Sequence, residues 1–379
     1  MGNIRLFFAG DFCSTSSSEP IKVSDELCEL IGSCDLRCIN FEVPLKPDVK
    51  LPPQNRLRFC QHDDVPAFLQ CHGFNLFSIA TNHTFDWGEE GFRKTKAVLG
   101  DSAFGAGIYD DAYKVKVVEV DGVKIGFLAL CFAAYTGVFN DVANHEGLGC
   151  AYINDLLVNH VIVDAKKEVD FLIILPHDGI EYIDIPLPET IARYRDFIDW
   201  GADAVVGTHP HCPQGWEKYK DKPIFYSLGN FLFNSKDGYD YRAWNRPHWY
   251  EGLCVVITIE DETLSWEVVN TRNVDNLAIE IDHVETRNRH NETICQYLLS
   301  KDLYKKHLIK VCNELGIREI SIVDKTYHQN NLKTCTKMLL KCWMNKLKKK
   351  DIINDYPLLR LLTHDARRSL LMWTLKQNR

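Results

Sequence analysis

The chain has 379 residues, of which 45% are hydrophobic and 25% charged, and its formal net charge is -8 at pH 7. This composition excludes a disordered chain and is sufficient for one large domain or two ordinary ones. The opening MGNIRLFFAGDF has no cleavable signal pattern, and nowhere do 18 apolar residues run together. We therefore expect a cytoplasmic protein without a transmembrane segment.

Fourteen cysteines are scattered through apolar segments such as LALCFAA and EGLCVV, and none forms a C-x-x-C pair. This distribution favours buried, reduced thiols over a disulfide framework. Cys34 and Cys38 lie close together, but a zinc site would need two further ligands at matching spacing, so we expect none there.

Up to about residue 275, short β-branched or aromatic runs end at Gly, Pro, Asn or Asp and alternate with helical stretches, which predicts an α/β domain. Helices are predicted over residues 24–33, 65–73, 88–101 and 188–201, the last closed by Gly201. Asp121-Gly122 suits the type I′ turn of a β-hairpin. Strands are predicted over residues 4–10, 36–42, 75–81, 113–120, 124–132, 170–177, 202–209, 223–230, 253–260 and 264–272.

Beyond about residue 285, apolar residues recur at spacings of three and four, which predicts helices. Residues 301–379 carry a local charge of +11, with 18 Lys and Arg against 7 Asp and Glu, so residues 1–300 carry -19. The lysine run at 346–350 could contact a phosphate-rich polymer or a membrane surface, although a solvated helix end is the commoner explanation. We divide the chain into a domain of residues 1–280 and a basic α-helical region of residues 285–379.

Polar residues that can bind metal follow six of the apolar runs, at the ends where α/β folds place their sites. Each alone is a weak signal, because Asp or Asn after a strand usually caps a turn and a lone His is usually structural. Their recurrence indicates a site, and the mixture of carboxylate, carboxamide and imidazole suits Mn²⁺, Fe, Zn²⁺ or Mg²⁺. The residues are Asp11, Glu42, Asn82 and His83 with Asp86, His177 with Asp178 and Glu181, His209 with His211, and Asn230.

His209 and His211 lie in GTHPHCPQG, directly after the run ADAVV. Since a residue before proline favours extended conformations, His209 is predicted to continue the strand, and residues i and i+2 of a strand face one side. Both imidazoles are thus predicted to point into one site. Glu42 could bridge two ions ~4 Å apart there, a separation that suits hydrolysis.

Seven segments follow the order and approximate spacing of a known family over about residues 4–235: GDF, NFEVPL, IATNHTFDWGEEGF, GAGIYDDAY, PHDGIEY, GADAVVGTHPHCPQG and KPIFYSLGNFLF. On these segments the chain resembles the CapA family of poly-γ-glutamate capsule proteins, a branch similar to calcineurin-like metallophosphoesterases. The resemblance implies a four-layer α/β/β/α sandwich of two mixed sheets, followed here by a C-terminal helical extension.

The resemblance also implies two divalent metal ions and a metal-bound hydroxide as nucleophile. His83 would protonate the leaving group or steady the developing charge, and Asp86 would orient His83. The implied ligands are Asp11 and His211 for one ion, Asn82, His177 and His209 for the other, and Glu42 between them.

Two positions depart from the family pattern. Cys13 stands where the wider superfamily has the His of Asp-x-His, which predicts a weakly held or thiolate-assisted first metal. Asp178 stands where the family usually has Trp in His-Trp-Gly-x-Glu-Tyr, which adds charge near His177.

Arg56 and Arg58 are candidates for binding a phosphate or carboxylate group, because a guanidinium matches such groups in a bidentate way. Surface arginines on an edge strand explain them equally well. Trp87, Trp244 and Trp249 could line a cleft, although packing is the commoner role of an aromatic side chain.

Our leading hypothesis is a metal-dependent hydrolase of phosphoester type that acts on a small-molecule or polymer-linked substrate. A second is a poly-γ-glutamate or capsule accessory protein, or a γ-glutamyl amide hydrolase. A third is a non-catalytic module that binds anionic polymer through the basic tail. No specific nucleic-acid partner is predicted.

Overall fold

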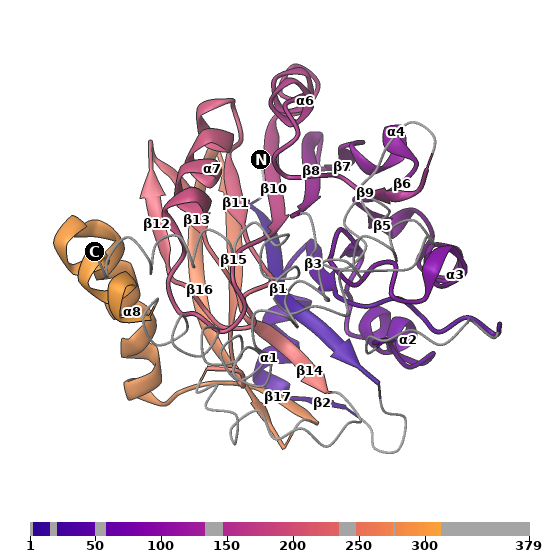
Figure 1. The fold of residues 1–379 in the computed structure, drawn as a ribbon, viewed down its shortest axis with the longest axis horizontal. Helices are drawn as coiled ribbons and strands as arrows, with labels where there is room; N and C mark the ends of the chain where they lie inside the picture. The colour runs from indigo at the N-terminus through magenta and orange to yellow at the C-terminus, as the bar shows by residue number, and fades with distance from the viewer. Residues whose placement is uncertain are drawn as a thin grey trace, which may run out of the picture.

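A computed structural model describes residues 3–15, 21–49, 58–132, 147–234, 248–275 and 277–311. Arg56, Trp244 and the lysine run at 346–350 lie outside these residues, as does most of the predicted helical region. The described chain is a mixed α/β fold of two larger mixed sheets with flanking helices (Figure 1), which confirms the predicted α/β class.

The larger sheet is built on β1, which pairs in parallel with β3 and β14 and antiparallel with β15. Its parallel half orders β1, β3, β4 and β5, so these strands end at the same edge. The strands are β1 (Ile4–Ser14), β2 (Lys22–Val23), β3 (Leu36–Phe41), β4 (Leu76–Ser78), β5 (Ala103–Phe104), β14 (Asn230–Asn234), β15 (Glu251–Glu260), β16 (Thr263–Val274) and β17 (Ala278–Ile281).

The second sheet has the order β12-β13-β11-β10-β8-β7, with a parallel centre and antiparallel edges. Its predicted hairpin is confirmed, because Asp121 and Gly122 adopt φ of 50° and 83° between β7 and β8. These strands are β7 (Lys116–Val120), β8 (Val123–Cys131), β10 (Phe171–His177), β11 (Ala204–Val206), β12 (Trp216–Tyr219) and β13 (Lys222–Phe225); β6 (Ala106–Gly107) and β9 (Gly149–Cys150) form a separate pair.

The strand predicted over residues 223–230 is present at residues 223–225 but does not continue to 230, because the segment divides between the two sheets. β13 ends at Phe225 in the smaller sheet, and β14 begins at Asn230 beside β1 in the larger one. Gly229, at φ 66°, allows the turn between them. A continuous apolar run therefore concealed a crossing of the chain from one sheet to the other.

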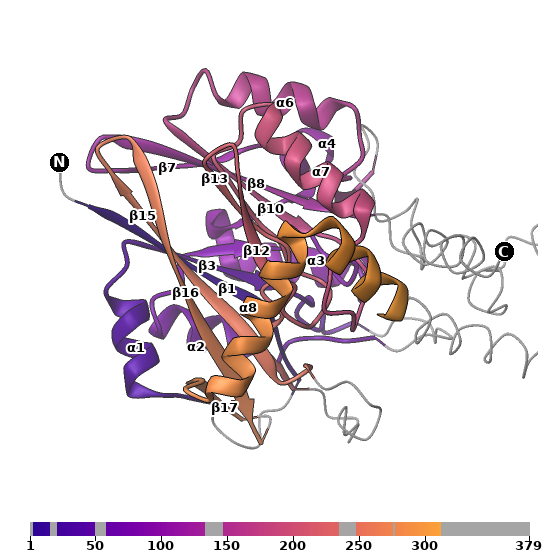
Figure 2. The same ribbon diagram turned by 90° about the vertical axis from the view of Figure 1, so that its left-hand side faces the viewer.

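The four helices predicted before residue 275 are all present, and two further helices were missed. Figure 2 shows α6 and α7 beside the smaller sheet and α1 and α2 on the side of the larger sheet. α1 begins at Asp25, and the preceding Ser24, where the predicted helix starts, is its N-cap, whose side chain accepts a hydrogen bond from the Leu27 amide. The helices are α1 (Asp25–Gly32), α2 (Val65–Cys71), α3 (Gly88–Leu99), the missed α4 (Tyr109–Ala112) and α6 (Leu157–Ala165), α7 (Pro188–Asp199) and α8 (Glu285–Leu299).

Aromatic contacts connect the two sheets through one hydrophobic core. Phe8 of β1 lies 6.4 Å from Phe127 of β8, and Phe225 of β13 lies 6.5 Å from Trp266 of β16, between ring centroids. β8 and β10 are buried almost throughout, as their continuous apolar runs predict. This packing fixes the ends of strands from one sheet against those of the other.

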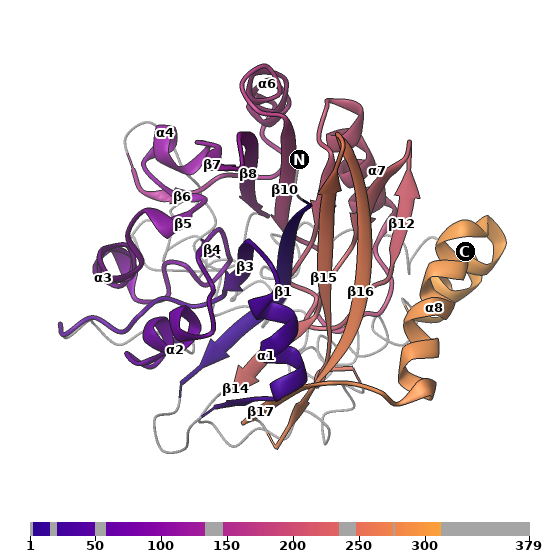
Figure 3. The ribbon, with the colours of Figure 1, turned by 180° about the vertical axis from the view of Figure 1, so that it is seen from behind.

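The described part of the C-terminal region packs on the rest of the chain. α8 lies beside the β12 edge (Figure 3), where the Trp216 amide donates to Cys295 Sγ at 3.3 Å. Residues 301–311 are also helical, and their buried Leu308 contacts an isoleucine-rich loop between β10 and α7. No helix within the described residues is both long and apolar enough to cross a membrane.

Candidate functional site

The polar residues selected from the sequence converge at the ends of strands from both sheets. Asp11 lies in β1 at a register shift, Glu42 directly follows β3, and His177 is the last residue of β10. One ligand atom from each of these three lies within 4.8 Å of the others, and all three side chains are buried. Asn82 follows β4, His209 and His211 follow β11, and Asn230 begins β14.

Asn40 holds the two carboxylates together. Its Nδ2 donates to Asp11 Oδ1 and to Glu42 Oε2, both at 2.7 Å. The remaining Glu42 oxygen, Oε1, lies 3.4 Å from His177 Nε2 and accepts no hydrogen bond from the described residues. A buried carboxylate oxygen without a donor is costly, so the cluster suits a cation at this oxygen.

His177 is held by contacts on both ring nitrogens. Nε2 lies 2.8 Å from Asn82 Oδ1, and Nδ1 lies 3.0 Å from Thr208 Oγ1. When Nδ1–H donates to the Thr208 hydroxyl oxygen, Nε2 keeps its lone pair and can face the same position as the Asn82 carbonyl oxygen. The imidazole and the carboxamide therefore present a pair of ligand atoms beside Glu42.

His211 forms the opposite side of the cluster. Its Nδ1 lies 2.9 Å from Asn230 Oδ1 and 3.3 Å from Asp11 Oδ2. Its ring packs between Trp249 and Phe233, each at 5.0 Å between centroids. The predicted association of His211 with Asp11 is therefore present in the geometry.

The predicted extended conformation of the two histidines is wrong. β11 ends at Val206, and His209 and His211 adopt φ of 100° and 56°. The chain turns because hydrogen bonds to other segments override the local preference before proline. The His209 amide donates to Asp11 Oδ2 at 3.2 Å, and Pro210 O accepts from the Tyr182 amide at 2.7 Å. Both imidazoles nevertheless reach the cluster, since the His209 ring lies 4.8 Å from that of His177 and 6.0 Å from that of His211.

Charges within the cluster offset one another. Burial alone would raise the pKa of Glu42, but the charge of His177 and its contact with Glu42, together with the charges of His211 and His83, lower that pKa to about 2. Burial, followed by the charge of Glu42, raises the pKa of Asp11. Burial alone would lower the pKa of His211, whereas its hydrogen bond with Asp11 and the charges of Asp11 and Glu42 together raise it to about 9. A cation that binds here would replace positive charge already supplied by protonated imidazole.

His83 borders the cluster and has the predicted partner. Its Nδ1 lies 2.9 Å from Asp86 Oδ2, which also accepts from the Phe59 amide at 3.0 Å. Burial would lower the pKa of His83, but Asp86 outweighs this effect and raises it. The side chain of His83 is 19% exposed, against 2% for Asp86. His83 is therefore positioned between the buried cluster and the solvent.

The further candidates lie in different surroundings. Cys13 is buried beside Val43 and Trp249, and burial, followed by the charge of Glu42, raises the pKa of its thiol well above 9, which disfavours a thiolate. Asp178 accepts from Thr190 Oγ1 at 3.4 Å and so lies toward α7. The charge of Glu181 contributes to the raised pKa values of His83 and His211.

A cationic, aromatic surface lies next to Asp86. The guanidinium carbon of Arg58 lies 5.4 Å from the Trp87 ring centroid, and Lys46 Nζ lies 5.2 Å from it. Phe59 links this surface to Asp86. Its carbonyl oxygen accepts a hydrogen bond from the Trp87 indole at 3.0 Å, and its amide donates to Asp86. Trp249, in contrast, is buried against His211 and lines no surface.

Sequence reasoning missed Asn40 and Thr208. Asn40 stands two residues before Glu42 in the segment NFE, and alternation along β3 places both on one face. That spacing was the available signal for Asn40. Thr208 had none, because its role depends on the bridge between His177 and the turn after β11.

A family model described as "Bacterial capsule synthesis protein PGA_cap" matches residues 6–235. The chain is 31% identical over 207 residues to the "Capsule biosynthesis protein CapA" of Bacillus anthracis. This match covers 52% of this chain and 49% of that protein. It is 32% identical over 169 residues to the "PGA biosynthesis protein CapA" of Bacillus subtilis (strain 168). This match covers 42% of this chain and 43% of that protein.

A further match is a "Probable polyglutamine synthesis accessory protein" of Mycobacterium tuberculosis (strain ATCC 25618 / H37Rv), 27% identical over 211 residues and covering 52% of this chain and 55% of that protein. The chain thus spans about half the length of the curated relatives it matches.

Proposed function

The chain belongs to the family of bacterial capsule synthesis proteins PGA_cap, and on this premise we propose that it is a metal-dependent hydrolase of phosphoester bonds in a small or polymeric anionic substrate. The observation that carries the proposal is the buried cluster of Asp11, Glu42 and His177, in which Glu42 Oε1 accepts no hydrogen bond from the described residues. A site designed only for packing would not retain such an oxygen.

The ligand set divides into two groups around Glu42. Asp11 and His211 would hold one cation, while Asn82, His177 and His209 would hold the other. Oxygen and nitrogen donors of this kind accept Mn²⁺, Fe, Zn²⁺ or Mg²⁺. Cations bound there would supply Lewis acidity and an activated water to the reaction.

The residues around the cluster have separate tasks. Asp86 fixes Nδ1 of His83 and leaves Nε2 as the ring nitrogen that donates a proton to the leaving group. Lys46 and Arg58 place positive charge on the Trp87 face of the site, where an anionic substrate would bind. Arg56 is a second candidate for this task.

We also propose the wider organisation that the resemblance implies. The two mixed sheets and their flanking helices would form a four-layer α/β/β/α sandwich within residues 1–280. Residues 285–379 would form a basic α-helical region appended to it.

A variant pair tests the hydrolase. Glu42→Gln removes the carboxylate between the proposed cations, whereas Glu90→Gln changes an exposed carboxylate on α3. We expect the wild type and Glu90→Gln to bind divalent metal and to hydrolyse an aryl phosphate, and Glu42→Gln to lose both properties. Equal turnover by the Glu42→Gln protein would contradict the proposal.

A second candidate function is the hydrolysis of γ-glutamyl amide bonds, or an accessory role in the synthesis of that polymer. The names of the capsule and PGA biosynthesis relatives favour it. Incubation with poly-γ-glutamate alongside the aryl phosphate separates the two. Turnover of poly-γ-glutamate alone would replace the phosphoesterase by an amide hydrolase at the same site.

A further inference from the structure

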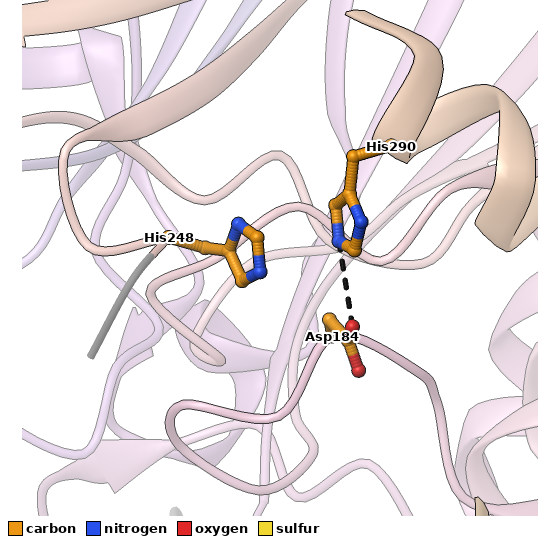
Figure 4. Close-up of side chains that lie close together, drawn as sticks. All are labelled: Asp184, His248 and His290. Carbon is orange, nitrogen blue, oxygen red and sulfur yellow. Dashed lines mark ion pairs between the residues drawn. The ribbon is translucent and has the colours of Figure 1, made fainter. Parts of the chain in front are cut away.

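A second group of metal-binding side chains lies outside the proposed active site. One ligand atom each from Asp184, His248 and His290 lies within 4.8 Å of the others. Figure 4 shows the three side chains facing one another from three separate segments. Asp184 comes from the loop between β10 and α7, His248 lies just before β15, and His290 lies in α8. Residues this distant in the sequence meet here only through the tertiary fold.

Two neighbouring residues orient these ligands. His248 Nδ1 lies 2.7 Å from Glu251 Oε2, so Nδ1 must donate its proton to that carboxylate, and Nε2 retains its lone pair. His307 Nε2 lies 2.9 Å from Asp184 Oδ1, which leaves Oδ2 on the side of His290. Carboxylate and imidazole partners of this kind typically fix the orientation of metal ligands.

His290 and Asp184 lie close enough for an ion pair but do not form a hydrogen bond. His290 Nε2 is a buried atom 3.4 Å from Asp184 Oδ2 and has no hydrogen-bond partner among the described residues. The rings of His248 and His290 are nearly parallel, with centroids 4.2 Å apart. Two imidazoles that stack beside one carboxylate bring two nitrogen donors and one oxygen donor together. A cation bound here would satisfy all three atoms once the two rings tilt out of their parallel stack, because each nitrogen lone pair lies in its own ring plane.

We propose that Asp184, His248 and His290 bind one Zn²⁺ ion that fastens α8 to the loop between β10 and α7. Two imidazoles and one carboxylate are a common ligand set for Zn²⁺, with a fourth position left for water or another side chain. The ligand side chains are between 13% and 27% exposed, so an ion can enter without unfolding of the chain.

The position of this site gives the ion a structural consequence. Asp184 follows Tyr182, whose ring lies 6.0 Å from that of His211, and His248 precedes Trp249, whose ring lies 5.0 Å from it. Tyr182 and Trp249 are themselves 5.7 Å apart. The ion therefore holds the two segments that carry the aromatic side chains around His211, while its ligands remain separate from the proposed catalytic ones.

Zinc binding by the full chain tests the site. We expect His290→Ala and His248→Ala to bind one Zn²⁺ fewer per chain than the wild type in equilibrium dialysis with metal analysis. His283→Ala is the matched control, because the His283 side chain is 71% exposed and, within the described part of the chain, forms an ion pair with Glu26 only. Circular dichroism establishes that each variant is folded, and His248→Ala leaves α8 itself unaltered.

The thermal response to zinc gives a second readout. Since the ion joins three segments of the folded chain, zinc should raise the melting temperature of the wild type and His283→Ala more than that of His290→Ala. Unchanged zinc stoichiometry in both ligand variants would overturn the proposal and leave a metal-free histidine–carboxylate cluster. Glu42→Gln keeps the two sites distinguishable, because its loss of zinc reports on the proposed active site alone.

Discussion

Replacing Asn40 with alanine removes the amide that joins the two buried carboxylates. Asn40 Nδ2 is 2.7 Å from Asp11 Oδ1 and 2.7 Å from Glu42 Oε2, and both carboxylates are fully buried. Alanine cannot donate to either oxygen. The variant therefore brings two negative groups together with less compensation than the wild type, and we expect it to be less stable in the absence of metal.

The magnitude follows from the number and kind of bonds lost. A hydrogen bond to a charged group contributes ~1.5–3 kcal/mol, so two such bonds contribute about 3–6 kcal/mol to the free energy of unfolding. Water that enters the space left by the amide recovers part of this free energy. We therefore expect the free energy of unfolding to fall by about 3 kcal/mol. A bound cation would supply the missing positive charge, so the loss should be smaller when metal is present.

Urea denaturation in a chelator, and again in Mn²⁺ or Zn²⁺, measures both quantities. Asn75→Ala is the matched control, since Asn75 is exposed and its Oδ1 accepts one hydrogen bond, from the Arg37 amide at 2.9 Å. We expect this control to lose less than about 1 kcal/mol, with no dependence on metal. A loss below about 1 kcal/mol for Asn40→Ala, or an equal loss with and without metal, would refute the reasoning.

Three further changes have defined outcomes. His83→Ala should abolish turnover and leave metal content nearly intact, and unchanged activity would remove His83 from the mechanism. Gly10→Ala would place a Cβ 2.0 Å from the backbone oxygen of Gly229, and calorimetry should register a destabilisation of about 1–3 kcal/mol; a wild-type melting temperature would contradict this close approach. Leu308→Ala opens a fully buried contact, so limited proteolysis should cut faster within residues 285–311, and an unchanged rate would show that this contact contributes little.

The convergence of the site could be predicted from the sequence because parallel strands leave little freedom at their ends. Asp11, Glu42 and His177 each terminate or follow a long apolar run, and such runs form the parallel centres of the two sheets. The carboxyl ends of parallel strands share an edge, so the residues after them must lie near one another. The sequence could not indicate that the two edges belong to different sheets, because that depends on how the sheets pack.

The turn after β11 was unpredictable for a related reason. Local rules favour an extended His209 before Pro210, whereas its amide is held by Asp11, nearly 200 residues earlier in the chain. A left-handed conformation at both histidines persists because the surrounding fold determines it, as at many functional sites. Conformational propensity depends on the neighbours of a residue in the sequence, whereas the backbone conformation of these two histidines is determined by their neighbours in space.

The same limit applies to the C-terminal region, which the sequence separates from the rest by charge and periodicity. Leu308 and His290 lie within that helical region, yet their contacts are with the loop between β10 and α7. That loop begins one residue after His177 and carries Tyr182 to the ring of His211. A change in α8 therefore has a short physical path to the proposed active site, through side chains that no compositional boundary reveals. Residues 285–311 are thus better regarded as a support for the proposed site than as part of an independent basic tail.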